Sequence, residues 1–375
     1  MSIKPLFFGF SLLFIGTMSV DITNAGTLDK IKERGAVQCG VNRTGPGVST
    51  LNTAGEWVGF FADFCRAVAA ATLQAASAVE FVELNQRTRF DATRQGAVDL
   101  FSANTTWTLT RDASIGLQFT NTLYYDGQGF IAPVSLNAKN LKEVSKAAVG
   151  VTGNTTTEGN LAEYIRANRL DFTIITLTSN DSAVSSFLSR RCNLYTTDRL
   201  ALAGLRAAGT NKPEDYVVFP EIISKEPLGP VVRNDDPAWF TIVRWIAFAM
   251  IAAEEKGVDS TNVARMRNSS DAEVRRLLGV EPGLGKSLGL DEAWASRVIE
   301  QVGNYGQVFE RNLGAGSALH LDRGINASWT KGGLIYAPPM RCLPSSICLR
   351  PLWPSYSRRD TGKSGISFFD IAQSQ

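Results

Sequence analysis

The sequence predicts an α/β protein with two similar lobes joined by two extended segments. Strand-like and helix-like segments alternate from residue 36 onward, which is the pattern of an α/β sheet protein. The same order of segments occurs twice, and an extended segment follows each occurrence. Of the 375 residues, 44% are hydrophobic and 20% are charged, so the chain can bury two sizeable cores.

The repeated unit reads strand, polar loop, helix, strand, helix, strand, polar loop. In the first copy we expect strands at 36–41, 79–84 and 98–101, helices at 64–73 and 87–95, and polar loops at 42–47 and 102–112. In the second copy we expect strands at 147–151, 171–177 and 193–195, helices at 159–168 and 182–190, and polar loops at 152–158 and 196–198. Parallel strands with crossover helices explain this order, and ligands bind where the loops leave the strands.

Two extended segments, 124–133 and 217–232, follow the two copies and predict hinge crossovers between the lobes. We therefore expect lobe 1 to begin at 26–130, lobe 2 to span 131–222, and 223–341 to return to lobe 1 with a helical extension. Within that return, 238–255 predicts one buried helix and 291–311 another. The second carries an apolar stripe at helical spacing: Trp294, Val298, Ile299, Val302, Tyr305 and Phe309.

The first residues predict export. Lys4 precedes an apolar run at 6–20, and small and polar residues lead to Ala25. This is the pattern of a secretory signal sequence at 1–25, with cleavage near Ala25, and the run is short for a membrane span. We expect the mature protein in the periplasm.

Composition argues against several classes of function. The formal net charge of +2 is too small to indicate a nucleic-acid partner. A single histidine leaves little for metal sites or catalytic triads, and segment 279–287 (GVEPGLGKS) is one residue too long for a phosphate-binding loop. We expect no metal and no cofactor.

Five cysteines fit an oxidising compartment but leave one unpaired. Cys39 lies in the first predicted strand and Cys65 near the start of the following helix, so their side chains can meet. A disulfide there would contribute about 3 kcal/mol to stability. Metal binding is the alternative, but neither cysteine has a second ligand at suitable spacing.

Several segments resemble the solute-binding proteins of polar amino-acid ABC importers: RGAVQCGV, NTTWTLTRD, YYDGQGF, NTTTE, PEIISKEPLGP, QVGNYGQVFERN and KGGLIYAPP. The resemblance covers nearly all of 27–341. It implies a bilobed type II periplasmic binding protein fold, no catalysis, and delivery of L-amino acids to inner-membrane ABC permease subunits by a monomer.

Arg111 matches the carboxylate-binding arginine of that family, and a guanidinium can bind a carboxylate through two hydrogen bonds. Asn104 and Thr106, in the same loop, match positions that add hydrogen bonds. On the other lobe, Thr156 matches a residue that helps to hold the carboxylate. Asp198 matches the acidic residue that binds the α-ammonium, although an Asp there is also typical of a turn or cap.

Thr155 has two interpretations. Thr155 and Glu158 have the spacing of a capping box, and a helix N-terminus is itself an anion site. We therefore keep both a capping role and a ligand-binding role for Thr155.

The sequence departs from the family in three places. Gly45 occupies a loop position where an apolar side chain often lines the pocket. Gly150 stands where the partner of Cys192 is expected, and the resemblance ends at Arg341. Residues 342–375 are rich in Pro, Ser and Arg and lack periodicity, so we expect a disordered tail.

Two other functions remain open from the sequence. Dehydratase-type enzymes share this fold and need a cleft acid with a raised pKa, for which Glu83 and Asp126 are candidates. A protein that presents its ligand to a separate receptor is the other alternative.

Overall fold

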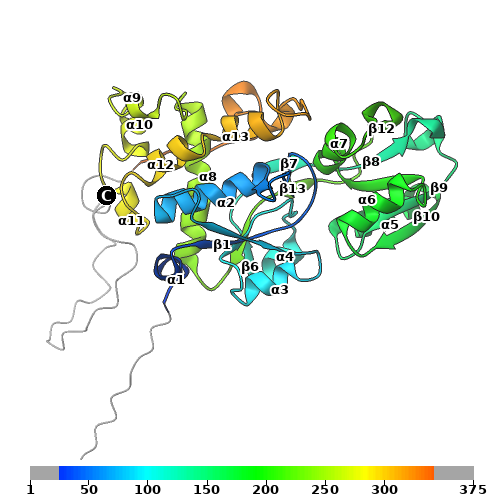
Figure 1. Cartoon of the computed structure of the whole chain (residues 1–375), viewed down its shortest axis with the longest axis horizontal. Coiled ribbons are helices and arrows are strands. Elements are labelled where there is room, and N and C mark those ends of the chain that lie inside the picture. The colour runs from blue at the N-terminus through cyan, green and yellow to red at the C-terminus, as the bar shows by residue number, and fades with distance from the viewer. Residues whose placement is uncertain (1–24, 342–375) are drawn as a thin grey trace, which may run out of the picture.

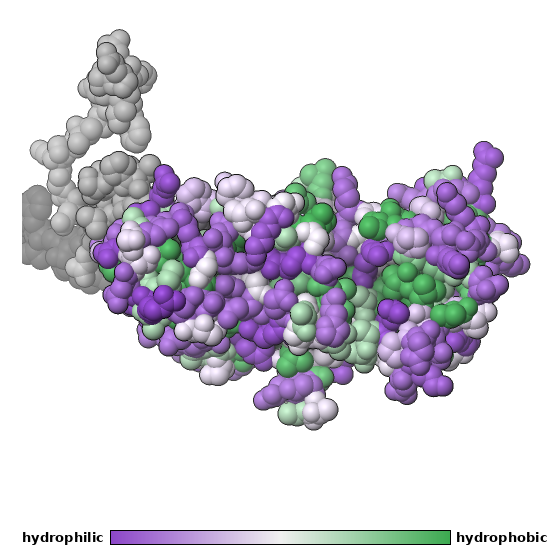
Figure 2. All heavy atoms as spheres, turned by 90° about the horizontal axis from the view of Figure 1, so that it is seen from above, coloured by the Kyte–Doolittle hydropathy of each residue, from purple (hydrophilic) through white to green (hydrophobic). Residues whose placement is uncertain are grey.

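The computed structural model describes residues 25–341 and has two α/β lobes joined by a narrow connection (Figure 1). Each lobe is built on one five-stranded sheet, as the sequence predicts. The surface in Figure 2 is mostly hydrophilic, with separate apolar patches. The expected signal sequence before residue 25 and the tail at 342–375 lie outside the described residues.

The sheet of lobe 1 has the strand order β4-β1-β5-β14-β6. Its strands are β1 (Val37–Val41), β4 (Val79–Glu83), β5 (Leu100–Phe101), β6 (Leu117–Phe119) and β14 (Val231–Arg233). Strands β4, β1 and β5 are parallel, and β14 runs antiparallel to both β5 and β6. The helices α2 (Phe60–Leu73) and α3 (Arg89–Arg94) make the crossovers between the parallel strands.

The sheet of lobe 2 repeats this arrangement with the order β10-β9-β11-β8-β12. Its strands are β8 (Gln128–Pro133), β9 (Lys146–Thr152), β10 (Asp171–Leu177), β11 (Leu194–Asp198) and β12 (Tyr216–Val218), with the crossover helices α5 (Thr156–Asn168) and α6 (Asn180–Leu188). In both lobes the second strand of the repeat pairs with the first, the first with the third, and the third with an antiparallel crossover strand. The repeat predicted from the sequence is therefore confirmed.

Two strands form the connection between the lobes. Strand β7 (Tyr124–Asp126) pairs antiparallel with β13 (Glu226–Leu228), and Asp126 lies directly opposite Glu226. The chain continues from β7 into β8 of lobe 2, and from β13 into β14 of lobe 1. Both predicted crossovers are thus extended, and their pairing places two carboxylates at the hinge.

The helix α8 (Pro237–Glu255) lies in the core of lobe 1, where it packs against α2. It is long and apolar enough to span a membrane by composition alone. However, Trp239, Ile246 and Ala253 are all fully or nearly fully buried. This supports the prediction of a core helix.

The other α-helices and strands, apart from the two helices described next, are α1 (Thr27–Arg34), β2 (Thr50–Leu51), β3 (Trp57–Val58), α4 (Leu109–Ser114), α7 (Arg199–Ala208), α9 (Val263–Met266), α10 (Ala272–Leu277) and α11 (Leu284–Ser287).

The prediction of one continuous helix at 291–311 is wrong. The structure has two helices, α12 (Trp294–Gln301) and α13 (Tyr305–Asn312), separated by a short break. Gly303 has a φ of 99°, which a helix cannot contain, and Asn304 caps α13 in a reciprocal capping box with Gln307. The apolar stripe still packs as expected, because all six of its residues are buried.

The predicted disulfide between Cys39 and Cys65 is present. It joins β1 to α2 within the core of lobe 1, and the two Cα atoms are 6.0 Å apart. The bond therefore closes the first strand–loop–helix segment of the chain. Cys192 is a buried free thiol in lobe 2.

Gly150 lies directly against Cys192, as the resemblance implies. A Cβ atom built on Gly150 would lie 3.5 Å from Cys192 Cβ and 3.0 Å from its Sγ. Disulfides require a Cβ–Cβ distance of about 3.5–4.5 Å.

We therefore expect Gly150→Cys to form a second disulfide with Cys192 in exported protein. Peptide mapping without reductant should recover the linked pair. Gly150→Ser is the matched control, and recovery of free thiols at both 150 and 192 would contradict the prediction.

Candidate functional site

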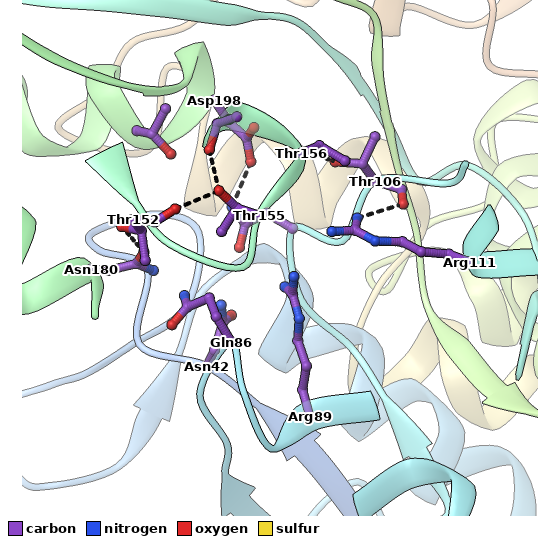
Figure 3. A pocket seen from close by; sticks show the side chains of 13 residues that line it. Asn42, Gln86, Arg89, Thr106, Arg111, Thr152, Thr155, Thr156, Asn180 and Asp198 are labelled. Atoms are coloured by element: carbon purple, nitrogen blue, oxygen red, sulfur yellow. Dashed lines mark hydrogen bonds between the residues drawn. The ribbon is translucent and has the colours of Figure 1, made fainter. Parts of the chain in front are cut away.

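A polar cleft lies between the two lobes, next to the hinge (Figure 3). It is lined from lobe 1 and lobe 2 by Asn42, Gln86, Arg89, Asn104, Thr106, Arg111, Thr152, Thr155, Thr156, Thr157, Asn180, Thr197 and Asp198. All six predicted ligand-binding residues are in this set. Their roles toward a ligand remain predictions.

The lobes are close together around this cleft. Its cavity volume is about 30 Å³, enough for about two or three water molecules. Asn180 of lobe 2 donates a hydrogen bond to the carbonyl of Arg43 in lobe 1 at 3.1 Å. A Cβ atom on Gly204 would lie only 2.5 Å from the carbonyl oxygen of Pro46, so this close approach requires a glycine.

We expected Arg111 to lie in a polar loop. In the structure it lies in the short helix α4. The hydroxyl of Thr108 caps this helix by accepting from the backbone N–H of Arg111. One guanidinium nitrogen of Arg111 donates to the carbonyl of Thr106 at 2.8 Å, which orients the side chain toward the cleft. Burial lowers the pKa of Arg111, and the negative charges of Glu226 and Asp198 oppose that shift.

Asp198 ends strand β11 and stands at the N-cap position of α7, but its side chain does not cap that helix. Instead, the amide of Asn104, in lobe 1, donates to the Asp198 carboxylate at 2.6 Å. Asn104 is held in turn by the hydroxyl of Thr44, which donates to its carbonyl oxygen at 2.7 Å. Burial raises the pKa of Asp198 well above its usual range, and the nearby charges of Asp126 and Glu226 raise it further.

Thr155 and Thr156, at the N-terminus of α5, have different roles. Thr155 is the N-cap: its hydroxyl accepts from the N–H of Glu158 at 3.3 Å and donates to the carbonyl of Thr152 at 2.6 Å. The predicted capping box is incomplete, because the Glu158 carboxylate accepts from the N–H of Asn154 instead. Thr156 turns its hydroxyl across the cleft to within 3.3 Å of the Thr106 hydroxyl.

Glu226, in the hinge strand β13, was not identified from the sequence. It is 1% exposed and accepts hydrogen bonds from residues of both lobes. Its donors are the hydroxyls of Thr106, Thr156 and Ser224 and the amide of Asn160. Glu226 lies within the segment PEIISKEPLGP that carries the resemblance, but only the pairing of β13 with β7 brings it beside the cleft, against Thr106 and Thr156.

Arg89 was also missed. It begins helix α3, is 4% exposed, and points into the cleft beside Gln86 (Figure 3). In the sequence it is one of several arginines in a polar helical segment, a pattern that is typical of a solvated surface.

The two carboxylates considered for catalysis do not line the cleft. Glu83 is half-exposed and forms an ion pair with Arg43 at 3.2 Å. Burial raises the pKa of Asp126 to about 7, but both of its oxygens accept backbone N–H groups, from Gly127 and Leu200. Asp126 is therefore engaged in the hinge.

Residues 37–257 match the model for bacterial extracellular solute-binding proteins, family 3. The chain belongs to this family. Its bilobed fold and interlobe cleft are those of a solute-binding protein, and this agrees with the resemblance noted in the sequence.

Two relatives and one solved structure are similar to this family 3 protein over most of its length. The general L-amino acid-binding periplasmic protein AapJ of Rhizobium johnstonii is 44% identical over 335 residues, which cover 89% of this chain and 97% of that protein. The glutamate/glutamine/aspartate/asparagine-binding protein BztA of Rhodobacter capsulatus is 44% identical, with 90% and 99% covered. A periplasmic binding protein from Brucella ovis with glutathione bound is 44% identical, covers 84% and 100%, and has a TM-score of 0.83. These are binding proteins, which separates the chain from the dehydratase-type enzymes.

The capping role of Thr155 leads to a stability prediction. Removal of a threonine N-cap costs about 1 kcal/mol because a helix N–H loses its acceptor. We expect Thr155→Ala to lower the free energy of unfolding of the family 3 protein by about that amount. Thr155→Ser, which keeps the hydroxyl, should be close to wild type in denaturant unfolding. Equal stability of the alanine and wild-type proteins would contradict the capping role.

Proposed function

We propose that this protein captures L-amino acids in the periplasm and delivers them to an inner-membrane ABC-type permease. The main support is the charge arrangement of the cleft, with Arg111 on the lobe 1 side and Asp198 on the lobe 2 side. An amino acid needs donors for its carboxylate and an acceptor for its ammonium, both sheltered from water. Arg111 supplies the first and Asp198 the second.

The remaining predicted residues fit the same ligand pose. Thr156 lies at the N-terminus of α5, where helix N–H groups favour an anion. Asn104 and Thr106 lie on the lobe 1 wall and can add hydrogen bonds. In this pose the ligand contacts both lobes, so its binding favours the closed arrangement.

The ligands of the similar proteins, as their names give them, share one pair of charged groups. Amino acids carry an α-carboxylate and an α-ammonium, and the γ-glutamyl end of glutathione carries the same pair. This common group is what Arg111 and Asp198 would recognise. We further propose export by a signal sequence cleaved near Ala25 and action as a monomer.

The proposal is tested by titration calorimetry of the mature protein with the twenty L-amino acids. Arg111→Ala should reduce affinity for every ligand at least 100-fold, since loss of one partner of an enclosed charge pair costs about 3–5 kcal/mol. Arg111→Lys keeps the charge but loses the pair of hydrogen bonds to the carboxylate, so its affinity should fall between those of wild type and Arg111→Ala. An unchanged circular dichroism spectrum controls for folding. Wild-type affinity in Arg111→Ala would contradict the assignment.

The raised pKa of Asp198 predicts a pH dependence of binding. The free protein keeps a proton on Asp198 to higher pH than an exposed aspartate does, because burial and the neighbouring carboxylates disfavour its charge. An ammonium ligand favours the ionised form. Binding should therefore release a proton, and affinity should rise with pH across the titration of Asp198.

Calorimetry at a series of pH values, each in two buffers with different ionisation enthalpies, measures this proton release. Asp198→Asn, studied at high ligand concentration, should show no release. Affinity that does not fall as the pH is lowered, while the protein stays folded, would contradict a role for Asp198 in binding the ammonium.

A further inference from the structure

The interlobe cleft contains a buried arginine that has no partner. The side chain of Arg89 makes no hydrogen bond or ion pair within residues 25–341, and its Nε atom is buried and unsatisfied. Buried arginines are normally paired, because an uncompensated charge away from water is costly. Here the guanidinium points into the cavity rather than into the protein core (Figure 3).

Arg89 and Arg111 form a positively charged pair on the lobe 1 side of the cleft. Both guanidiniums lie over the ring of Phe90, at 4.6 Å for Arg89 and 5.2 Å for Arg111. Burial and, to a lesser extent, the charge of Arg111 lower the pKa of Arg89 to about 9, against the opposing charge of Asp198. One neighbouring carboxylate, Asp198, favours the charged form of Arg89, whereas Asp198 and Glu226 both favour the charged form of Arg111.

The two arginines of the cleft differ in the carboxylates near them. Glu226 and Asp126 also lie close by, but their charges act on Arg111 and Asp198 and are not among the groups that shift the pKa of Arg89. Arg89 and Arg111 carry two positive charges, and Asp198 is the one carboxylate among the lining residues of the described chain. A zwitterionic amino acid that places its carboxylate at Arg111 and its ammonium at Asp198 leaves Arg89 without a counter-charge. A ligand with a second carboxylate brings one further negative charge, and that charge matches the unpaired guanidinium.

We propose that Arg89 binds a second carboxylate of the ligand, so that the cleft prefers dicarboxylic amino acids such as L-glutamate and L-aspartate. This proposal rests on the proposed function, in which Arg111 binds the α-carboxylate. An uncharged carboxamide side chain offers Arg89 a hydrogen-bond acceptor without the charge, and an aliphatic side chain leaves it without a partner. The order of affinity is therefore acidic, then amide, then aliphatic ligands.

Two other roles of Arg89 predict different effects of its removal on affinity and stability. If Arg89 and Arg111 share the α-carboxylate, loss of Arg89 weakens all L-amino acids equally. If Arg89 serves only to pack on Phe90, its loss lowers stability and leaves the preference among ligands unchanged. The two possibilities are separated by comparing ligands of equal size that differ in charge.

The experiment measures affinity for L-glutamate and L-glutamine by titration calorimetry. Wild type should prefer L-glutamate, and Arg89→Met should lower the glutamate-to-glutamine affinity ratio about 100-fold. Arg89→Lys keeps a charge and should retain part of the preference. Arg94→Met is the matched control: Arg94 lies on the same helix, is exposed, and pairs with Asp91 at 2.7 Å, so its loss should not change the ratio.

Thermal unfolding without ligand adds a second readout. Since Arg89 makes no hydrogen bond or ion pair within residues 25–341, Arg89→Met should melt at the same temperature as wild type or higher. A lower melting temperature with an unchanged ratio would overturn the proposal in favour of a packing role. An equal loss for both ligands would overturn it in favour of a shared α-carboxylate site.

Two further outcomes separate this proposal from the proposed function. Wild type that binds L-glutamine more tightly than L-glutamate contradicts the role of Arg89 alone. Wild type that binds none of the twenty L-amino acids contradicts the proposed function as well.

Glutathione also carries a second carboxylate, farther from its α-amino acid end. If glutathione binds more tightly than L-glutamate, and Arg89→Met removes that advantage, the result would support a second carboxylate site at Arg89. It would also show that this site suits the longer distance between the two carboxylates of glutathione.

Discussion

The hydrogen bonds of Glu226 connect the hinge to both walls of the cleft. Its carboxylate accepts from Thr106 on lobe 1 and from Thr156 and Asn160 on lobe 2, while its own backbone belongs to hinge strand β13. A buried carboxylate needs such donors, because loss of any one leaves a charged group less well solvated. The residues proposed to hold a ligand are therefore positioned by the same group that joins the two crossovers.

This arrangement concentrates negative charge at the hinge. Asp126 and Glu226 face each other across the β7–β13 pair, and Asp198 lies close enough for both charges to raise its pKa. The cleft walls carry the opposite charge on Arg89 and Arg111. Carboxylates at the hinge and guanidiniums on the lobe 1 wall create a field suited to a ligand with an ammonium at one end and carboxylate at the other.

The repeat could be predicted from the sequence, because alternating strands and helices with polar exits permit few topologies. Arg111, Thr156 and Asp198 were found through the resemblance, since a lone Arg, Thr or Asp after a strand carries no local signal. Arg89 and Glu226 were missed because their burial depends on pairings distant in the chain, which periodicity does not reveal. The break between α12 and α13 is different, because Gly303 and Asn304 are ordinary stop and start signals that the apolar stripe outweighed.

The contacts between the lobes also explain how a ligand can take part in closure. The amide of Asn104 donates to Asp198 across the cleft, at the carboxylate where we propose that the ammonium binds. An ammonium makes a stronger, charge-assisted hydrogen bond than a neutral amide does, so the ligand can replace Asn104 there with a net gain. The contacts between Thr106 and Thr156, and between Asn180 and the carbonyl of Arg43, do not involve Asp198. Because neutral hydrogen bonds each contribute only about 1 kcal/mol, the charged ends of the ligand supply the larger part of the preference for the closed lobes.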